Sequence, residues 1–193
     1  MTDPIIRTAF HKDILKSAHQ DVDTIVVDEL GLKNGQVRAD IAVLNGKLVG
    51  YEIKGERDSL VRLLPQVDAY SEVFEKAYII TAEKHLDKVM KYIPEWWGIY
   101  VIKLNSDNKI LFQYERKAML NESRDVYRIA QLLWKSEAAE ILSHHFGYKI
   151  KSVYTRQQLY SLLAEACNPN LMSELVLKYL KNREGWRIGQ PQL

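Results

Sequence analysis

Apolar residues in the first 117 positions follow two alternating spacings along the chain. Short runs rich in β-branched and aromatic residues predict strands, whereas segments with apolar residues three and four positions apart predict helices. The expected strands cover residues 24–29, 37–44, 47–54, 77–81, 99–104 and 110–115. The expected helices cover residues 4–19, 65–76 and 84–92. This alternation predicts an α/β fold, a mixed sheet with flanking helices, that ends near residue 117.

The pattern beyond residue 119 is wholly helical. Helices are expected at residues 126–146, 156–166 and 171–181, and no strand-like run separates them. Thr155 and Gln158 have the spacing of a capping box, and Asn168-Pro169 is a typical helix start. We therefore expect a core over residues 1–117 and an all-helical C-terminal subdomain over residues 118–193.

The segment from residue 37 to residue 54 carries the candidate chemistry. Two apolar runs flank Asn45-Gly46, which is a strong hairpin signal. Asp40, Glu52 and Lys54 interrupt these runs. A carboxylate in a strand that is apolar on both faces is costly to desolvate unless a cation compensates it. Glu52 and Lys54 are two residues apart, so both side chains project from one face of the strand.

The register of this hairpin decides whether the Asp40 side chain lies on the same face of the sheet as Glu52 and Lys54. A two-residue turn at Asn45-Gly46 would place Asp40 and Glu52 on opposite faces of the sheet. A three-residue loop over residues 44–46 would pair Asp40 with Gly50 and make the two carboxylates diagonal neighbours, about 7–8 Å apart at Cα. They would then be close enough to hold one ion. The sequence leaves both registers open.

One pattern in the sequence resembles the PD-(D/E)xK nuclease superfamily. It consists of Asp40, then Glu52-Ile53-Lys54, and then a helix with Gln66 and Tyr70. Within this superfamily, the chain is similar to a family of small bacterial and phage proteins that is distantly related to the MmcB-like DNA-repair proteins. The segments that carry this likeness are Arg38–Ile41, Gly50–Lys54, Arg62-Leu63, Gln66, Tyr70 and Ile93–Gly98. The likeness extends over about residues 5–188. Many members have Pro before the aspartate, whereas this chain has Arg38-Ala39.

The resemblance implies a restriction-endonuclease-like core that hydrolyses phosphodiester bonds, with DNA as the expected substrate. Asp40, Glu52 and the Ile53 carbonyl would bind Mg²⁺ or Mn²⁺ through oxygen atoms. Lys54 would position or activate the attacking water and stabilise charge on the phosphate. Gln66 would lie beside the active site and orient the lysine, a water or a phosphate.

Glu29 is the candidate for a further metal ligand. Members of the superfamily commonly add an upstream Glu, often from the first helix, but that helix offers only Asp13 here. Glu29 stands at the expected end of the first strand, before the turn at residues 30–35. A solvated residue beside that turn is nearly as good an interpretation.

Candidate DNA contacts fall into two groups. In the core they are Arg38, Arg62 and Tyr70, although Tyr70 is equally well explained as a core residue. In the tail they are Lys178, Lys181, Arg183 and Arg187. Residues 149–193 hold seven Lys or Arg and three Glu, in a chain with a net charge of +2. The last two helices predict either a helix-turn-helix or a structural cap on the core.

Two other interpretations stay open on the sequence alone. The first is a structural role, in which an internal ion pair forms between Glu52 and Lys54 or between Asp40 and Arg38. The second is a non-catalytic DNA- or protein-binding module that keeps the nuclease fold. A homodimer is also left open.

The composition excludes some classes of protein but does not indicate an activity. The hydrophobic fraction of 47% suits a packed core, and no apolar run approaches the ~20 residues of a membrane span. The first residues lack the basic start of a signal peptide, so we expect a cytoplasmic location and no membrane partner. A single cysteine, Cys167, excludes an internal disulfide, and no His or Cys cluster has zinc spacing.

Overall fold

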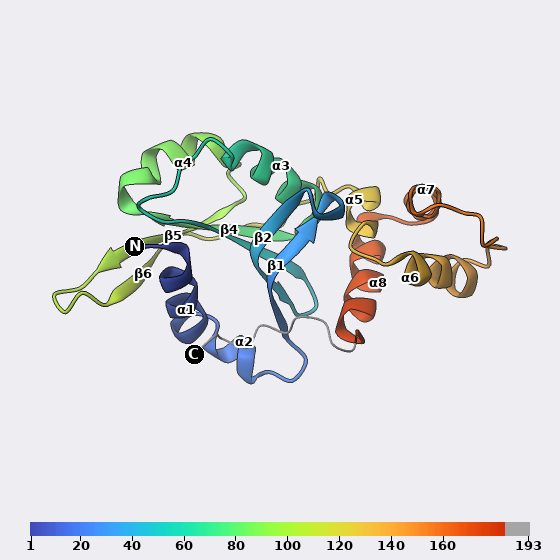
Figure 1. Ribbon diagram of the computed structural model, residues 1–193, viewed down its shortest axis with the longest axis horizontal. Coiled ribbons are helices and arrows are strands. Elements are labelled where there is room, and N and C mark those ends of the chain that lie inside the picture. Colours follow the sequence, from blue (N-terminus) through green and yellow to red (C-terminus); the bar gives the residue numbers. More distant parts are fainter. Residues whose placement is uncertain (184–193) are drawn as a thin grey trace.

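A six-stranded mixed sheet lies at the centre of the computed structural model, which describes residues 1–183 (Figure 1). The strands are β1 Ile25–Leu32, β2 Val37–Leu44, β3 Leu48–Lys54, β4 Lys76–Ala82, β5 Gly98–Leu104 and β6 Ile110–Arg116. They are ordered in space as in the sequence. The β3–β4 and β4–β5 pairs are parallel, and the other pairs are antiparallel. The predicted α/β class with its mixed sheet is therefore confirmed.

Helices cover both faces of this sheet (Figure 1). Each parallel pair needs a crossover connection, which α3 Leu63–Val73 and α4 Leu86–Tyr92 supply on one face. A 3₁₀ turn at Glu83–His85 precedes α4. On the other face lie α1 Asp3–Asp13 and α2 Lys16–Gln20. The two faces bury separate apolar clusters, with Val67 and Phe74 of α3 in one and Ile6 and Phe10 of α1 in the other.

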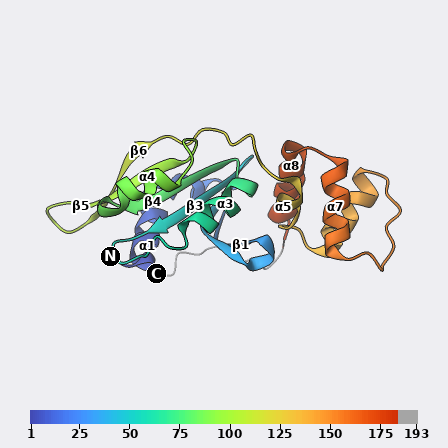
Figure 2. The same ribbon diagram turned by 90° about the horizontal axis from the view of Figure 1, so that it is seen from above.

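The C-terminal helices pack at one end of the sheet (Figures 1 and 2). They are α5 Val126–Ala130, α6 Lys135–Glu140 with a π-helical continuation Ile141–His145, α7 Arg156–Ala166 and α8 Pro169–Lys181. Ile129, Leu163 and Val176 belong to the same buried cluster as Tyr70 and Ile79. The four helices therefore share a core with the sheet. The division of the chain at residue 117 stays a prediction.

The caps that the sequence predicts for α7 and α8 are present. The Thr155 hydroxyl accepts from the Gln158 N–H at 3.2 Å, and the Gln158 side chain accepts from the Thr155 N–H at 2.8 Å. The Asn168 side chain accepts from the Leu171 N–H at 3.0 Å. These side chains satisfy N–H groups that the first turn leaves without helical partners. Within residues 1–183, no helix is long and apolar enough to cross a membrane.

The prediction of a single helix over residues 126–146 is wrong, because the helix is interrupted between α5 and α6. Distant side chains take the carbonyls released there. The Tyr160 hydroxyl donates to the Leu133 carbonyl at 2.7 Å, and Arg183 donates to the Leu132 carbonyl at 2.8 Å. The Trp134 N–H donates to a Glu137 carboxylate oxygen at 2.6 Å, which starts α6.

Three boundaries near the N-terminal half also differ from the prediction. The helix expected over residues 4–19 is divided at Ile14 and Leu15 into α1 and α2. The helix expected to reach Lys76 ends at Val73, and β4 takes Lys76. The first strand continues past Glu29 to Leu32, because pairing with β2 resumes at Leu30 after Glu29.

Candidate active site at the β2–β3 hairpin

The hairpin between β2 and β3 closes with a three-residue loop at residues 45–47. Leu44 pairs with Leu48, and Gly46 has a φ of +63°, in the left-handed region that glycine adopts without a steric penalty. The Asn45 N–H donates to the Lys47 carbonyl at 3.2 Å. The loop thus lies one residue later than the three-residue loop that the sequence offered.

This register changes the relation between the two carboxylates. The last paired positions are Ile41 and Tyr51, and continuing the register places Asp40 opposite Glu52. Both predicted pairings are therefore wrong, including that of Asp40 with Gly50. Asp40 and Glu52 are direct neighbours across the hairpin rather than diagonal ones.

The Tyr70 hydroxyl of α3 connects the two strands beyond their last paired positions. It accepts from the Asp40 N–H at 3.2 Å and lies 2.7 Å from a Glu52 carboxylate oxygen, to which it donates. The Ile53 N–H donates to the Asp40 carboxylate at 2.7 Å. These bonds link Asp40 and Glu52 through one buried tyrosine. Tyr70 is fully buried, so it belongs to the core and to the site at once.

Lys54 and Gln66 extend the same group. The Lys54 ammonium lies 2.6 Å from a Glu52 oxygen and 2.9 Å from the Gln66 side-chain oxygen. Glu52 is fully buried and Lys54 is 6% exposed. The Gln66 side-chain oxygen accepts from the Lys54 ammonium, and its role at the site stays a prediction. The Glu52–Lys54 contact is also the internal ion pair that the sequence left open.

Arg7 is the member of the site that the sequence did not indicate. From α1, its guanidinium donates to the Asp40 carbonyl at 2.5 Å and lies 3.5 Å from the Asp40 carboxylate. It also contacts Glu29 at 2.8 Å and Asp3 at 3.0 Å. The Asp3–Arg7 spacing is visible as a helical i,i+4 pair, but the contacts with Glu29 and Asp40 depend on how α1 packs on the sheet.

Glu29 is held by this arginine rather than directed to Glu52. Its φ of +57° is rare for a residue with a side chain, and it stands opposite Asp40 in the β1–β2 register. The strand alternation changes here, because Val27 and Leu30 lie in one buried cluster although they are three residues apart. The local distortion lets the Glu29 carboxylate reach Arg7.

Burial and proximity disfavour the charged forms of both carboxylates. Burial, followed by the repulsion from Glu52, raises the pKa of Asp40 to about 8, while the bond from the Ile53 N–H opposes the rise. Burial also raises the pKa of Glu52, against the opposing effect of Lys54. A bound cation relieves the same repulsion that protonation relieves.

The oxygen donors fit a hydrated divalent ion better than a closed protein cage. Within residues 1–183, no group of three or more His, Cys, Asp or Glu is arranged to hold a metal ion. Mg²⁺ commonly uses one or two carboxylates and keeps several waters. Asp40 and Glu52 meet that requirement, and Glu29 is paired with Arg7 instead.

Comparison with known proteins identifies the family. The model of the family described as Bacteriophage P4 protein cII matches residues 4–186. The chain belongs to this family. Protein cII of Enterobacteria phage P4 is 29% identical over 161 residues, which cover 83% of this chain and 60% of the phage protein. The chain thus spans about three fifths of the length of that relative.

Two solved structures are more distantly similar. The SPO1766 protein from Silicibacter pomeroyi has a TM-score of 0.44 and 14% identity, over 77% of this chain and 97% of that one. Pyrococcus furiosus SfsA in complex with Ca²⁺ has a TM-score of 0.38 and 13% identity, over 59% of this chain and 65% of that one. Likeness at these TM-scores supports no conclusion about function.

Two of the three core residues expected to contact DNA in this cII-family chain, Arg38 and Arg62, are exposed, whereas Tyr70 is fully buried and the expectation that it contacts DNA is wrong. The Arg38 side chain is 65% exposed and comes within 4.0 Å of Glu29 rather than Asp40. Arg62 is exposed and immediately precedes α3, four residues before Gln66. Both arginines are accessible to a phosphate.

The tail residues differ in their surroundings. Lys178 is exposed on α8, and Lys181 is half-buried. Arg183 lies 2.7 Å from a Glu137 oxygen and stacks over the Trp134 ring at 4.4 Å, so it holds the start of α6. Arg187 lies outside the described residues. Most apolar positions of α8 are buried, as both a structural cap and a helix-turn-helix require, so both stay predictions.

Proposed function

We propose that the β2–β3 hairpin forms the active site of a metal-dependent nuclease of the PD-(D/E)xK type, with DNA as its substrate. One observation carries the proposal. Two carboxylates from neighbouring strands, Asp40 and Glu52, share one site with a lysine that also bonds Gln66, and one buried hydroxyl joins the Asp40 N–H to the Glu52 carboxylate. A structural core has no need for two adjacent carboxylates whose charged forms are both disfavoured.

Asp40 and Glu52 are the residues that would hold Mg²⁺ or Mn²⁺. When bound there, the ion supplies charge stabilisation at the phosphate and lowers the pKa of a bound water. The Ile53 N–H holds the Asp40 carboxylate in place, and the Tyr70 hydroxyl does the same for Glu52. The Ile53 carbonyl as a further ligand stays a prediction.

Lys54 would supply a positive charge from the protein, in addition to that of the metal ion. An ammonium has three N–H donors, and the bonds to Glu52 and Gln66 occupy two of them. The third donor can point at an attacking water or a phosphate oxygen. Held by two partners, Lys54 would orient that water and stabilise charge on the phosphate.

A second candidate is a non-catalytic DNA-binding module with the same architecture. The observation that favours it is the pairing of each carboxylate with a cation of the chain, Glu52 with Lys54 and Asp40 with Arg7. A network in which each of these carboxylates has a cationic partner also serves as an internal support for the hairpin.

Cleavage assays distinguish the two candidates. The protein is incubated with Mg²⁺ or Mn²⁺ and linear, supercoiled, single-stranded or branched DNA, and EDTA should stop the reaction. Lys54→Ala should abolish cleavage while retaining metal binding, measured by calorimetry, because an ammonium is not a ligand. Asp40→Asn should lose both, because it removes a charged oxygen donor.

The matched control is Lys103→Ala, which removes an exposed strand lysine paired with Glu83 at 3.4 Å. It should cleave like the wild type. A wild-type protein that cuts none of these DNAs and no RNA, yet binds DNA as tightly as Lys54→Ala does, would establish the binding module instead.

A further inference from the structure

The two edge strands of the sheet, β1 and β6, differ in how readily they could pair with another strand. In β1, Glu29 has a φ of +57° and the pairing with β2 is interrupted there. Distortions of this kind protect an edge strand from pairing with other chains. In β6, residues 110–114 pair with β5 without interruption and include no charged residue and no Pro. Within residues 1–183 no strand pairs with the outer edge of β6, which is therefore open (Figure 1).

The hydrogen bonds of the β5–β6 hairpin show which backbone groups of β6 point outward. The Asn105 N–H donates to the Lys109 carbonyl at 3.0 Å, so these residues form a hydrogen-bonded pair. Along an antiparallel ladder such pairs alternate with pairs that share no hydrogen bond. In the observed register, Leu111 and Gln113 therefore bond to β5. The backbone groups directed away from the sheet belong to Ile110, Phe112 and Tyr114.

The side chains of these three residues form an apolar stripe on the face of the sheet that carries α1. The centroid of the Phe112 ring lies 5.1 Å from that of Phe10 in α1, and the Tyr114 ring lies 5.0 Å from Tyr100 in β5. Tyr114 is nevertheless 49% exposed, and Leu111, on the opposite face, is 51% exposed. Apolar surface is thus left uncovered on both faces beside the open edge.

A second copy of β6 matches this edge. Two identical antiparallel strands are related by a two-fold axis, and an axis at Phe112 places Ile110 opposite the partner's Tyr114. The outward N–H and C=O groups of both copies then face one another, as a ladder requires. On the apolar face, Phe112 meets the partner's Phe112, so the stripe continues from one copy into the other.

The charges at the ends of β6 favour this register. An axis at Phe112 places Lys109 opposite the partner's Glu115, and the symmetry repeats this pair at the other end. Both side chains are exposed, and neither forms a salt bridge with the described residues. An axis at Gln113 would instead place Lys109 opposite the partner's Lys117, and like charges directly opposite each other are unfavourable.

We propose that β6 pairs in antiparallel fashion with β6 of a second copy of this chain, with the two-fold axis at Phe112, so that two sheets join edge to edge. We expect one pair of short strands to bury less than the ~1,200 Å² of a standard interface, so the dimer should exchange with the monomer. The carboxylates of the β2–β3 hairpin are separated from β6 by β4 and β5. The dimer therefore forms whether or not those residues support cleavage.

Charge exchange tests the interface and its register. Sedimentation velocity over a wide range of protein concentration should show the average mass of the wild type rising from one chain towards two. Lys109→Glu should weaken self-association about tenfold, because it opposes two glutamates at both ends of the paired strands. Glu115→Lys should weaken it equally, and the variant with both changes should regain the wild-type affinity.

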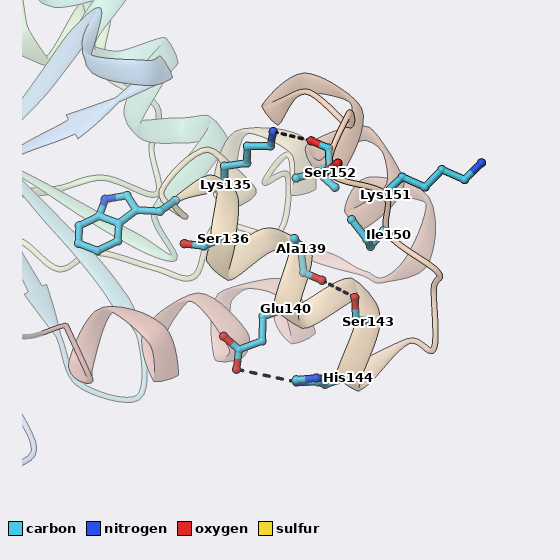
Figure 3. A pocket seen from close by; sticks show the side chains of 11 residues that line it. Lys135, Ser136, Ala139, Glu140, Ser143, His144, Ile150, Lys151 and Ser152 are labelled. Atoms are coloured by element: carbon cyan, nitrogen blue, oxygen red, sulfur yellow. Dashed lines mark hydrogen bonds and ion pairs between the residues drawn. The ribbon is translucent and has the colours of Figure 1, made fainter.

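The matched control is Lys151→Glu, which makes the same charge change in the helical end. Lys151 is exposed and its side chain points away from the neighbouring helix α6 (Figure 3). This variant should self-associate like the wild type. Unchanged thermal unfolding shows that all four variants are folded.

Hydrogen exchange tests the direction of the backbone groups. The amides of Ile110, Phe112 and Tyr114 should exchange severalfold more slowly at high protein concentration than at low concentration, because only the dimer bonds them. The amides of Leu111 and Gln113 bond to β5 within one chain and should be protected at both concentrations.

Three results would overturn the proposal. The first is a mass of one chain at every concentration, which would leave the edge to a strand of a different protein. The second is a dimer that the charge changes at Lys109 and Glu115 leave intact, or that the variant with both changes does not restore. The third is amide exchange of Ile110, Phe112 and Tyr114 that does not depend on concentration.

Discussion

The hairpin site and residues 149–156 of the helical end contain charged residues in opposite situations. At the hairpin, Glu52 and Lys54 are buried and paired with each other at 2.6 Å. In the helical end, Lys149, Lys151 and Arg156 are exposed and form no salt bridge with the described residues. Buried charges depend on their partners because they have lost their hydration, whereas exposed charges remain solvated and interact weakly until a ligand arrives. The charges at the hairpin should therefore contribute to stability, whereas those of residues 149–156 should contribute little to it.

The largest expected effect comes from breaking the buried pair. Lys54→Met removes the cation but keeps a long side chain, and it leaves the Glu52 carboxylate buried without its ionic partner. We expect a loss of about 3–5 kcal/mol in the free energy of unfolding, measured by urea denaturation. The double Ala replacement at Lys149 and Lys151 should change it by less than about 0.5 kcal/mol. Similar losses in both variants would contradict the contrast between the two regions.

The next effect is the pH dependence contributed by Asp40, whose pKa is raised to about 8 by burial and by Glu52. A carboxyl with a raised pKa in the folded state stabilises the fold fully below its unfolded pKa. That contribution is lost as the pH rises through the folded pKa. Asp40→Asn removes this titration and keeps an acceptor for the Ile53 N–H.

Wild-type stability relative to Asp40→Asn should therefore fall between pH 5 and pH 8, by up to about 4 kcal/mol. The midpoints of urea denaturation at pH 5 and pH 8, measured without added metal, give this change in stability. Glu52, Arg7 and Asp3 also face this group, so the difference between the two proteins is the quantity to compare. A constant difference across this range would show that the Asp40 carboxyl is not perturbed.

The smallest of these effects concerns Tyr70, which joins the Asp40 backbone N–H to the Glu52 carboxylate. Tyr70→Phe removes the hydroxyl that accepts from the Asp40 N–H and donates to Glu52. Because both groups lose a buried partner, we expect a loss of about 1–3 kcal/mol in the free energy of unfolding. Metal binding should weaken as well, since Glu52 loses the bond that orients it.

Tyr160→Phe is the matched control, because its hydroxyl donates to the Leu133 carbonyl in the helical end. It should lower stability by a similar amount and leave metal binding unchanged. If both variants weaken metal binding equally, Tyr70 acts through general stability rather than through the site.

The sequence by itself determined the strands, most of the helices and the residue types that meet at the hairpin. Six apolar runs became six strands in the described chain, and the capping box at Thr155 and Gln158 formed as expected. Side-chain periodicity and caps are local properties, so a few neighbouring residues suffice to encode them. The approach of Asp40 to Glu52 followed from that local pattern together with a three-residue loop.

The tertiary structure decided the register and the partners of these residues. The loop moved by one residue because Leu44 and Leu48 are both buried as a pair, and Arg7 reached Asp40 only because α1 packs across the sheet. The helix break after α5 depends on Tyr160 and Arg183, which lie 27 and 51 residues from the carbonyls that they bind. Such contacts carry no signal at short sequence separation, because they exist only once distant elements share a core.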